Sequence, residues 1–118
     1  VDADPLMINL GKKYLGLGEI KNLKIVSADA EKFITKQKEK FDLILIDLYT
    51  GSKIPDKFKT ENFIKTIREL IRNGGAVAFN YCHCENEDVN LYEKKIRKHF
   101  PYVRKIFPEA NIIFVCFK

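Results

Sequence analysis

Polar residues that could bind a ligand stand at the ends of strand-like segments, at four points along the chain. Three are acids and one is an amide: Asp2, Asp29, Asp47 and Asn80. Carboxylate and amide oxygens accept hydrogen bonds, so together they would suit a ribose diol, an exocyclic amine or a cationic ligand. Carboxylates that share one place also repel one another unless a ligand supplies donors or positive charge. We therefore expect these four residues to form a binding site.

An alternation of strands and helices has to position these residues. Apolar runs and helical periodicity predict strands at 23–29, 41–47 and 76–80, and helices at 5–17, 30–40, 60–73 and 85–100. Such alternation predicts a parallel sheet covered on both faces, with the carboxyl ends of its strands along one edge. Two further strands, 102–107 and 111–117, are joined by a link too short for a parallel crossover, so they must run antiparallel. The predicted fold class is α/β, mostly parallel with a C-terminal antiparallel strand pair.

Residues 41–47, with the sequence Phe-Asp-Leu-Ile-Leu-Ile-Asp, are predicted to be the central strand. A short apolar run bounded by turn residues is typical of a strand buried on both faces. Asp47 would then stand at the mouth of the ligand crevice that open parallel sheets present at the carboxyl ends of their strands.

Each acid also has a purely structural interpretation. Asp4 is expected to cap a helix that begins at Pro5, where the missing N–H of proline does no harm. Asp29 could equally cap the helix that begins at Ala30. Asp47 could be a turn residue whose side chain accepts loop N–H groups. Both alternatives stay open for these two acids.

The sequence Cys82-His83-Cys84 is the other group with possible chemistry. A zinc site needs a fourth ligand, which only Glu85 or Glu87 could supply at this spacing, so we expect no metal. A nucleophilic role has no partner pattern to support it. Three cysteines form no even disulfide framework, and reduced thiols are the simplest interpretation.

The composition is that of a globular protein: 118 residues, 46% apolar and 31% charged, enough for one domain. The apolar runs are far too short for a membrane span and no export signal precedes Val1, so we expect a cytoplasmic protein without membrane contact. The net charge is +5, but the lysines are spread over several predicted helices as on solvated faces. A nucleic-acid partner is therefore not expected.

An ordered set of short motifs resembles the spermidine synthase-like branch of the class I S-adenosylmethionine-dependent methyltransferases. The resemblance covers nearly the whole chain and implies a Rossmann-like methyltransferase sheet. The motifs that carry it are Asp2-Ala3-Asp4-Pro5, Ser27 to Phe33, Phe41 to Gly51 with Ile54-Pro55, Thr60 to Phe63, Gly74-Gly75 and Asn80.

The resemblance assigns a role to each acid. It implies that Asp2 holds the ribose hydroxyls of the nucleoside, and that Asp29 with Ala30 recognises the adenine amino group. Asp47 would face the sulfonium and the substrate amine, which makes it the candidate catalytic residue as well as a cofactor contact. The implied cofactor is S-adenosylmethionine or its decarboxylated form, and the implied reaction moves an alkyl group to an amine or other nucleophile.

The acceptor side of the site is expected at Tyr49, Thr50 and Asn80. In aminopropyltransferases a second acid usually follows the first three residues later, and this chain has Thr50 there. The departure weighs against polyamine aminopropyl transfer, which we keep as the alternative to methyl transfer.

A second departure concerns the beginning of the chain. The family's first strand and its glycine-rich loop precede the position of Asp2 and are absent from these 118 residues. We expect residues 1–118 to be a single, N-terminally incomplete domain of a longer protein. The other interpretations are a non-catalytic nucleoside-binding or dimerisation module, with a homodimer as its partner state, and nucleic-acid or ribosome-linked binding driven by the +5 charge.

Overall fold

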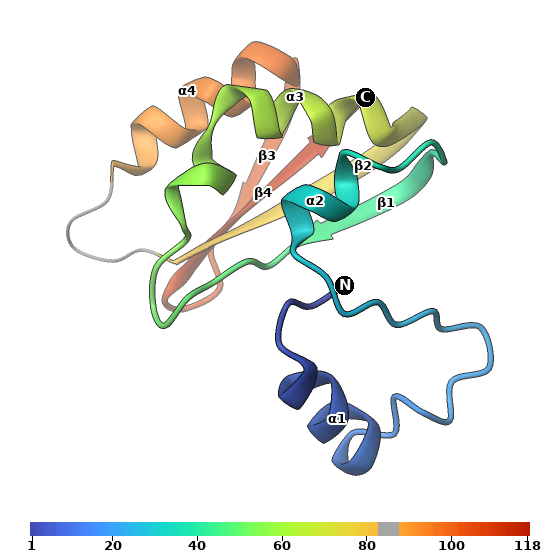
Figure 1. The fold of residues 1–118 in the computed structure, drawn as a ribbon. Helices are drawn as coiled ribbons and strands as arrows, with labels where there is room; N and C mark the ends of the chain where they lie inside the picture. The colour runs from blue at the N-terminus through green and yellow to red at the C-terminus, as the bar shows by residue number, and fades with distance from the viewer. Residues whose placement is uncertain (83–87) are drawn as a thin grey trace. The chain divides into compact units, whose positions relative to one another are not determined.

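The structure is a computed structural model that describes residues 1–82 and 88–118. The chain divides into two compact units, which we call the N-terminal unit (residues 1–37) and the sheet unit (residues 38–118), and each is described by itself. Figure 1 shows their helices and strands. The N-terminal unit contains α1 (Pro5–Tyr14) and α2 (Ala30–Ile34); the sheet unit contains β1 (Phe41–Ile46), the 3-10 helix η1 (Asp56–Lys59), α3 (Glu61–Leu70), β2 (Ile71–Cys82), α4 (Val89–His99), β3 (Tyr102–Ile106) and β4 (Asn111–Phe117). Every helix in the described part of the chain is too short or too polar to cross a membrane.

The sheet unit is built on a four-stranded sheet with the order β1-β2-β4-β3. Strands β1 and β2 run parallel, whereas β4 is antiparallel to both β2 and β3. The α/β class and the C-terminal antiparallel pair were predicted from the sequence and are confirmed. The bounds of β4 coincide with the predicted strand 111–117.

One face of this sheet is buried beneath α3 and α4, which Figure 1 shows on the same side. Side chains alternate along β2, so that Val77, Phe79 and Tyr81 point into this core. Aromatic rings hold α4 to the sheet, because Tyr92 stacks on Tyr81 at 5.0 Å and meets Phe79 edge to face at 6.2 Å. The amphipathic face of α3 completes the core with Phe63, Ile64, Ile67 and Leu70.

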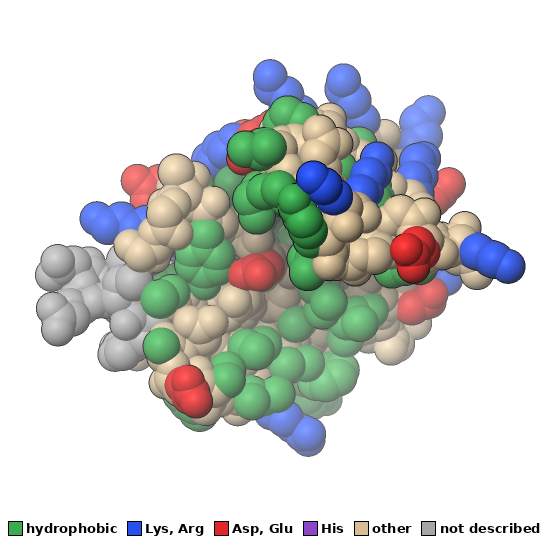
Figure 2. Space-filling view, turned by 90° about the horizontal axis from the view of Figure 1, so that it is seen from below, with side chains coloured by type: hydrophobic (Ala, Val, Ile, Leu, Met, Phe, Trp, Pro, Cys, Tyr) green, Lys and Arg blue, Asp and Glu red, His purple; other side chains and the backbone are tan. Residues whose placement is uncertain are grey.

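The opposite face of the sheet is open in the sheet unit. Leu43 is 56% exposed and Leu45 is 70% exposed, and both lie on this face of β1. Figure 2, which is seen from below the view of Figure 1, shows that hydrophobic side chains occur at the surface. The prediction of a central strand buried on both faces is therefore wrong for β1, which is an edge strand of this sheet. The physical reason is that both long helices of the unit cover the other face.

The third helix ends earlier than its sequence pattern predicts. Ile71 belongs to the apolar periodicity of the helix, yet it caps α3 and begins β2, where it is 1% exposed. Gly74 has a φ of 79°, and its N–H donates to Lys118 O at 2.9 Å, so the Gly-Gly segment joins the sheet instead of following the helix. The ladder with β1 is irregular at this point, between Phe41 and Leu43.

The N-terminal unit has less regular structure than predicted. Helix α1 begins as expected, with Asp4 as its N-cap and Pro5 in the first turn. The predicted strand 23–29 is reduced to one parallel bridge, between Asp2 and Ser27. Beyond Ser27 the pairing ends because the partner segment turns into α1 directly after Asp4. Helix α2 is also shorter than the predicted 30–40 and ends at Ile34.

Candidate functional site

Asp47 and Asn80 lie side by side at the carboxyl ends of the two parallel strands. The register of β1 and β2 pairs Ile46 with Phe79. Asp47 and Asn80, which follow these two residues, are therefore neighbours. Alternation places both side chains on the open face of the sheet, away from α3 and α4. The side-chain Nδ2 of Asn80 donates a hydrogen bond to Oδ1 of Asp47 at 2.9 Å. The structure thus joins two of the residues that the sequence predicted for the site.

Tyr49 joins the same group from the loop that follows β1. Its hydroxyl donates to the backbone carbonyl of Asn80 at 3.1 Å, which ties the start of this loop to the end of β2. Farther along, Ile54 and Phe58 are buried and anchor the loop against the core. Asp47, Tyr49 and Asn80 therefore form a connected polar cluster, which we call the acid-amide cluster.

Thr50 lies beside this cluster in sequence but makes its backbone hydrogen bonds elsewhere. Its N–H donates to Lys53 O at 2.9 Å, and Lys53 N donates back to Thr50 O at 3.3 Å. Gly51, inside this tight turn, has a φ of 61°, a conformation that suits glycine. The turn keeps Thr50 exposed at the surface.

The electrostatic surroundings of Asp47, directly after β1, differ from those of Asp42 within that strand. Asp42, at the opposite end of β1, accepts two hydrogen bonds from Nη1 of Arg72, at 2.9 and 2.7 Å. Within residues 1–82 and 88–118, no lysine or arginine forms an ion pair with Asp47. Its negative charge is held by a neutral amide.

The predicted nucleoside-binding acids are both in the N-terminal unit. Oδ1 of Asp2 accepts from Asp4 N at 2.8 Å, and Oδ1 of Asp29 accepts from Lys32 N at 3.1 Å as the N-cap of α2. The bridge between Asp2 and Ser27 brings the two acidic segments next to each other, with Ala30 as the first residue of α2. The helix-cap alternatives for Asp4 and Asp29 are therefore realised. That these acids share an edge with Asp47 and Asn80 stays a prediction.

The cysteines give no metal site in the part of the chain that the structure describes. No group of three or more potential ligands occurs there, and Cys116 is a free thiol. Cys116 is fully buried, and burial raises the pKa of its thiol to about 12. The other residues considered as metal ligands lie outside the described residues: His83, Cys84, Glu85 and Glu87.

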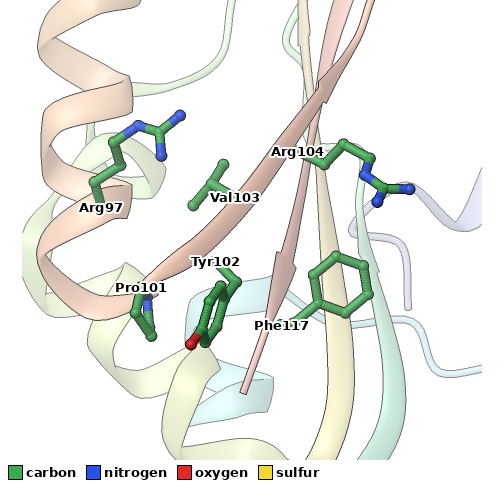
Figure 3. A pocket seen from close by; sticks show the side chains of 6 residues that line it. All are labelled: Arg97, Pro101, Tyr102, Val103, Arg104 and Phe117. Atoms are coloured by element: carbon green, nitrogen blue, oxygen red, sulfur yellow. The ribbon is translucent and has the colours of Figure 1, made fainter.

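A surface cavity of about 460 Å³ lies where α4 meets β3. Its lining residues belong to none of the sequence motifs described above. Figure 3 shows Arg97 and Arg104 on opposite sides of β3. Arg97 is also ion-paired with Glu93 at 2.7 Å. Tyr102 pairs with Phe117, and Phe117 pairs with Ala76 near the beginning of β2, so the cavity is at the opposite end of the sheet from Asn80. It is separate from the acid-amide cluster, and its arginines do not converge on one anion.

Similar proteins give the chain its family. The spermine/spermidine synthase domain matches residues 1–117. The chain is 29% identical over 117 residues to the N-terminal histidine N-methyltransferase of Emericella nidulans, which covers 95% of this chain. It is 34% identical over 84 residues to the polyamine aminopropyltransferase of Saccharolobus solfataricus, which covers 65% of this chain.

A solved structure shares the fold. Human methyltransferase-like protein 13 in complex with S-adenosylhomocysteine superposes with a TM-score of 0.80, at 22% identity and over 98% of this chain. The predicted Rossmann-like methyltransferase fold is confirmed by this likeness. The chain spans 20% of the fungal protein, 28% of the Saccharolobus protein and 58% of the solved human chain. Because the family domain matches almost the whole of this chain, the chain belongs to the spermine/spermidine synthase domain family.

Proposed function

We propose that the protein containing this chain is an S-adenosylmethionine-dependent transferase of the spermidine synthase-like kind, which moves an alkyl group from a sulfonium donor to an amine. The observation that carries the proposal is the exposed Asp47 carboxylate at the carboxyl end of β1, held by Asn80 and without a cationic partner among the described residues. Open α/β sheets bind their ligands at this end of the strands. The family match agrees with the proposal.

Asp47 is the proposed catalytic residue. Attack of an amine on an activated carbon places positive charge on the nitrogen, and a carboxylate beside it stabilises that charge. The same carboxylate aligns the nucleophile by accepting its N–H, so that attack becomes effectively unimolecular. An acid already neutralised by arginine, as Asp42 is by Arg72, would do both less well.

Asp2, Asp29 and Ala30 are the proposed nucleoside contacts. When bound, S-adenosylmethionine or its decarboxylated form would supply the activated carbon on a sulfonium. The two carboxylates suit such a group, because ribose hydroxyls and an adenine amino group are hydrogen-bond donors and carboxylates are acceptors. Oδ1 of Asp2 accepts from Asp4 N, and Oδ2 is the oxygen that we propose receives a ribose hydroxyl. The human relative by fold was solved with S-adenosylhomocysteine, which supports a cofactor of this type.

The identity of the transferred group rests on Tyr49, Thr50 and Asn80, the proposed acceptor side. Thr50 offers a neutral hydroxyl where a second acid would help to hold a polyamine, which favours methyl transfer. The likeness to a polyamine aminopropyltransferase keeps aminopropyl transfer as the second candidate.

We further propose that residues 1–118 are part of one larger domain. The open face and free edge of β1 support this, because exposed leucines beside an unpaired strand edge normally receive a cover. The small share of each curated relative that the chain spans points the same way.

The test is a titration of the full-length protein that contains this chain with S-adenosylmethionine and S-adenosylhomocysteine in a calorimeter, followed by product analysis by mass spectrometry. The products are compared after incubation with S-adenosylmethionine and with its decarboxylated form, each with 1,4-diaminobutane as a probe acceptor. We expect heat with both nucleosides and an alkylated amine with one donor. Absence of heat and of any thermal shift at millimolar nucleoside would overturn the transferase proposal.

The nucleic-acid alternative is tested separately by a salt series. Binding driven by phosphate contacts loses affinity steeply as salt rises, because counterions are released. We expect no RNA binding that follows this dependence. A steep slope together with no nucleoside binding would favour a nucleic-acid module over the transferase.

A further inference from the structure

The acid near the start of β1 and the acid directly after its end have partners of different charge. Asp42, at the amino end of the strand, is paired with a cation, since Nη1 of Arg72 reaches both of its carboxylate oxygens. Asp47, at the carboxyl end, receives one neutral N–H from Asn80. Both acids are exposed, so burial does not explain the difference. A carboxylate with an amide partner keeps its full negative charge, whereas one beside arginine loses most of its attraction for another cation.

The orientation of the Asn80 side chain satisfies Asp47 but leaves a polar atom of Asn80 unpaired among the described residues. Its Nδ2 faces Asp47, and its backbone carbonyl accepts from the Tyr49 hydroxyl at 3.1 Å. Its side-chain Oδ1 is buried and has no hydrogen-bond partner among residues 1–82 and 88–118. An unpaired buried acceptor costs about 1–3 kcal/mol. Turning the amide over would place its oxygen against the carboxylate, so the orientation is set by Asp47.

Proteins tolerate an unpaired buried acceptor mostly at functional sites. A function of Asp47 would therefore explain why Asn80 is oriented toward it. Placing an isoleucine or valine at position 80 would remove the unpaired oxygen but would leave Oδ1 of Asp47 without its donor. The amide therefore serves the carboxylate more than it serves the fold.

We propose that Asn80 is the positioning residue for Asp47. Its Nδ2 occupies Oδ1 and fixes the carboxylate, so that Oδ2 is presented to the N–H of an amine acceptor while the negative charge is retained. Tyr49 supports the arrangement by holding the Asn80 backbone in place. This inference rests on the proposed function, and it specifies an acceptor that carries at least one N–H donor next to positive charge.

The test uses three variants of the full-length protein that contains this chain. Asn80→Leu keeps the branched shape of the side chain and removes the donor, Asn80→Ser restores a smaller donor, and Asn62→Ala changes an exposed asparagine on α3 as the matched control. Each is titrated first with S-adenosylhomocysteine and then, in its presence, with 1,4-diaminobutane. The first titration tests the proposed function, and the second tests the role of Asn80.

We expect Asn80→Leu to weaken diamine binding by about ten- to a hundredfold, the effect of losing a hydrogen bond to a charged group. Asn80→Ser should recover most of the affinity, and Asn62→Ala should match the unsubstituted chain. All three should bind S-adenosylhomocysteine as the unsubstituted chain does. A loss of nucleoside binding that equals the loss of diamine binding would mean a merely structural role and would overturn the inference.

Two other outcomes also decide the matter. If the unsubstituted chain binds S-adenosylhomocysteine but no diamine, the inference is wrong while cofactor binding stands. If Asn80→Leu does not fold, nuclear magnetic resonance of the labelled, unsubstituted chain replaces it. Adding diamine to the nucleoside-loaded chain should then shift the Asn80 side-chain amide and the Asp47 carboxyl carbon, and unshifted signals would contradict the proposal.

Discussion

Nδ2 of Asn80 donates to Oδ1 of Asp47 at 2.9 Å, across 33 positions of sequence. The contact exists because β1 and β2 run parallel in a register that pairs Ile46 with Phe79. The same register places Asp42 near Arg72 at the other end of the strands. One pair of strands thus carries an acid neutralised by a cation at one end and an acid held by an amide at the other.

The two acids of β1 should respond differently to the same substitution. Asp47→Asn removes the charge at the proposed catalytic position, and we expect transfer to fall by about 10²-fold or more, the range for loss of an acid-base group. Asp42→Asn is the matched control and should leave transfer unchanged. Both acids are exposed, so both variants should unfold at nearly the temperature of the unsubstituted chain. Equal losses of activity in the two variants would show that Asp47 has no special role.

The position of Asp47 could be predicted from the sequence, but its partner could not. An apolar run that ends in an acid, within alternating strands and helices, indicates the carboxyl edge of a sheet. The register between two parallel strands leaves no comparable mark, so the contact with Asn80 became visible only in the structure. The exposure of Leu43 and Leu45 was also unpredictable, because a strand covered on one face and a strand covered on both can carry the same apolar residues.

Local competition explains the errors at the ends of elements. Ile71 continues the helical period of α3, but pairing with β1 and burial in the sheet outweigh that preference. The segment 23–29 has the composition of a strand, yet its pairing with the segment of Asp2 ends after Ser27, where that segment turns into α1. The helix cap at Asp4 was predicted well, because its hydrogen bond is made within a few residues.

Glu93 should stabilise the contact between α4 and β3 down to acidic pH. The hydrogen bond from Lys105, followed by that from Arg97, lowers the pKa of this carboxyl below its ordinary value of 4.5. Because the pKa is lowered in the folded state, the stabilisation is present above pH 4.5 and is lost as pH falls through the lowered value. Glu93→Gln should reduce the free energy of unfolding at neutral pH by about 1 kcal/mol. Urea unfolding at neutral and acidic pH measures this difference, which should shrink as the pH falls.

The control for Glu93 is Glu61→Gln, which breaks the more exposed pair with Lys98 between α3 and α4. We expect this variant to unfold almost as the unsubstituted chain does. A larger effect at Glu61 than at Glu93 would contradict the importance assigned to the link between α4 and β3.

Cys116 should make the protein sensitive to alkali. Burial raises the pKa of its thiol from 9.0 to about 12, so the folded state keeps the proton over a range in which the unfolded chain releases it. Stability is therefore complete below pH 9.0 and falls as pH rises toward 12, by about 1.4 kcal/mol per pH unit for this one group. Cys116→Val keeps an apolar side chain and should flatten the pH dependence of the unfolding free energy. An unchanged slope would show that the buried thiol is not responsible.

Gly75 should control the register that brings Asp47 to Asn80. A Cβ at this position would lie 2.7 Å from the carbonyl oxygen of Asp42 and 2.9 Å from Cγ2 of Ile71, in the place where β1 meets β2. Relief of these contacts requires the backbone to move, so Gly75→Ala should destabilise the chain by about 1–3 kcal/mol. Gly18→Ala is the control, because the Cβ added there would be 4.0 Å from its nearest neighbour. Urea unfolding measures the stability, and the resonance of the Asn80 side-chain amide reports the register. If the strands shift, the amide signal changes together with the loss of stability; full stability in Gly75→Ala would show that β1 can move from β2 without strain.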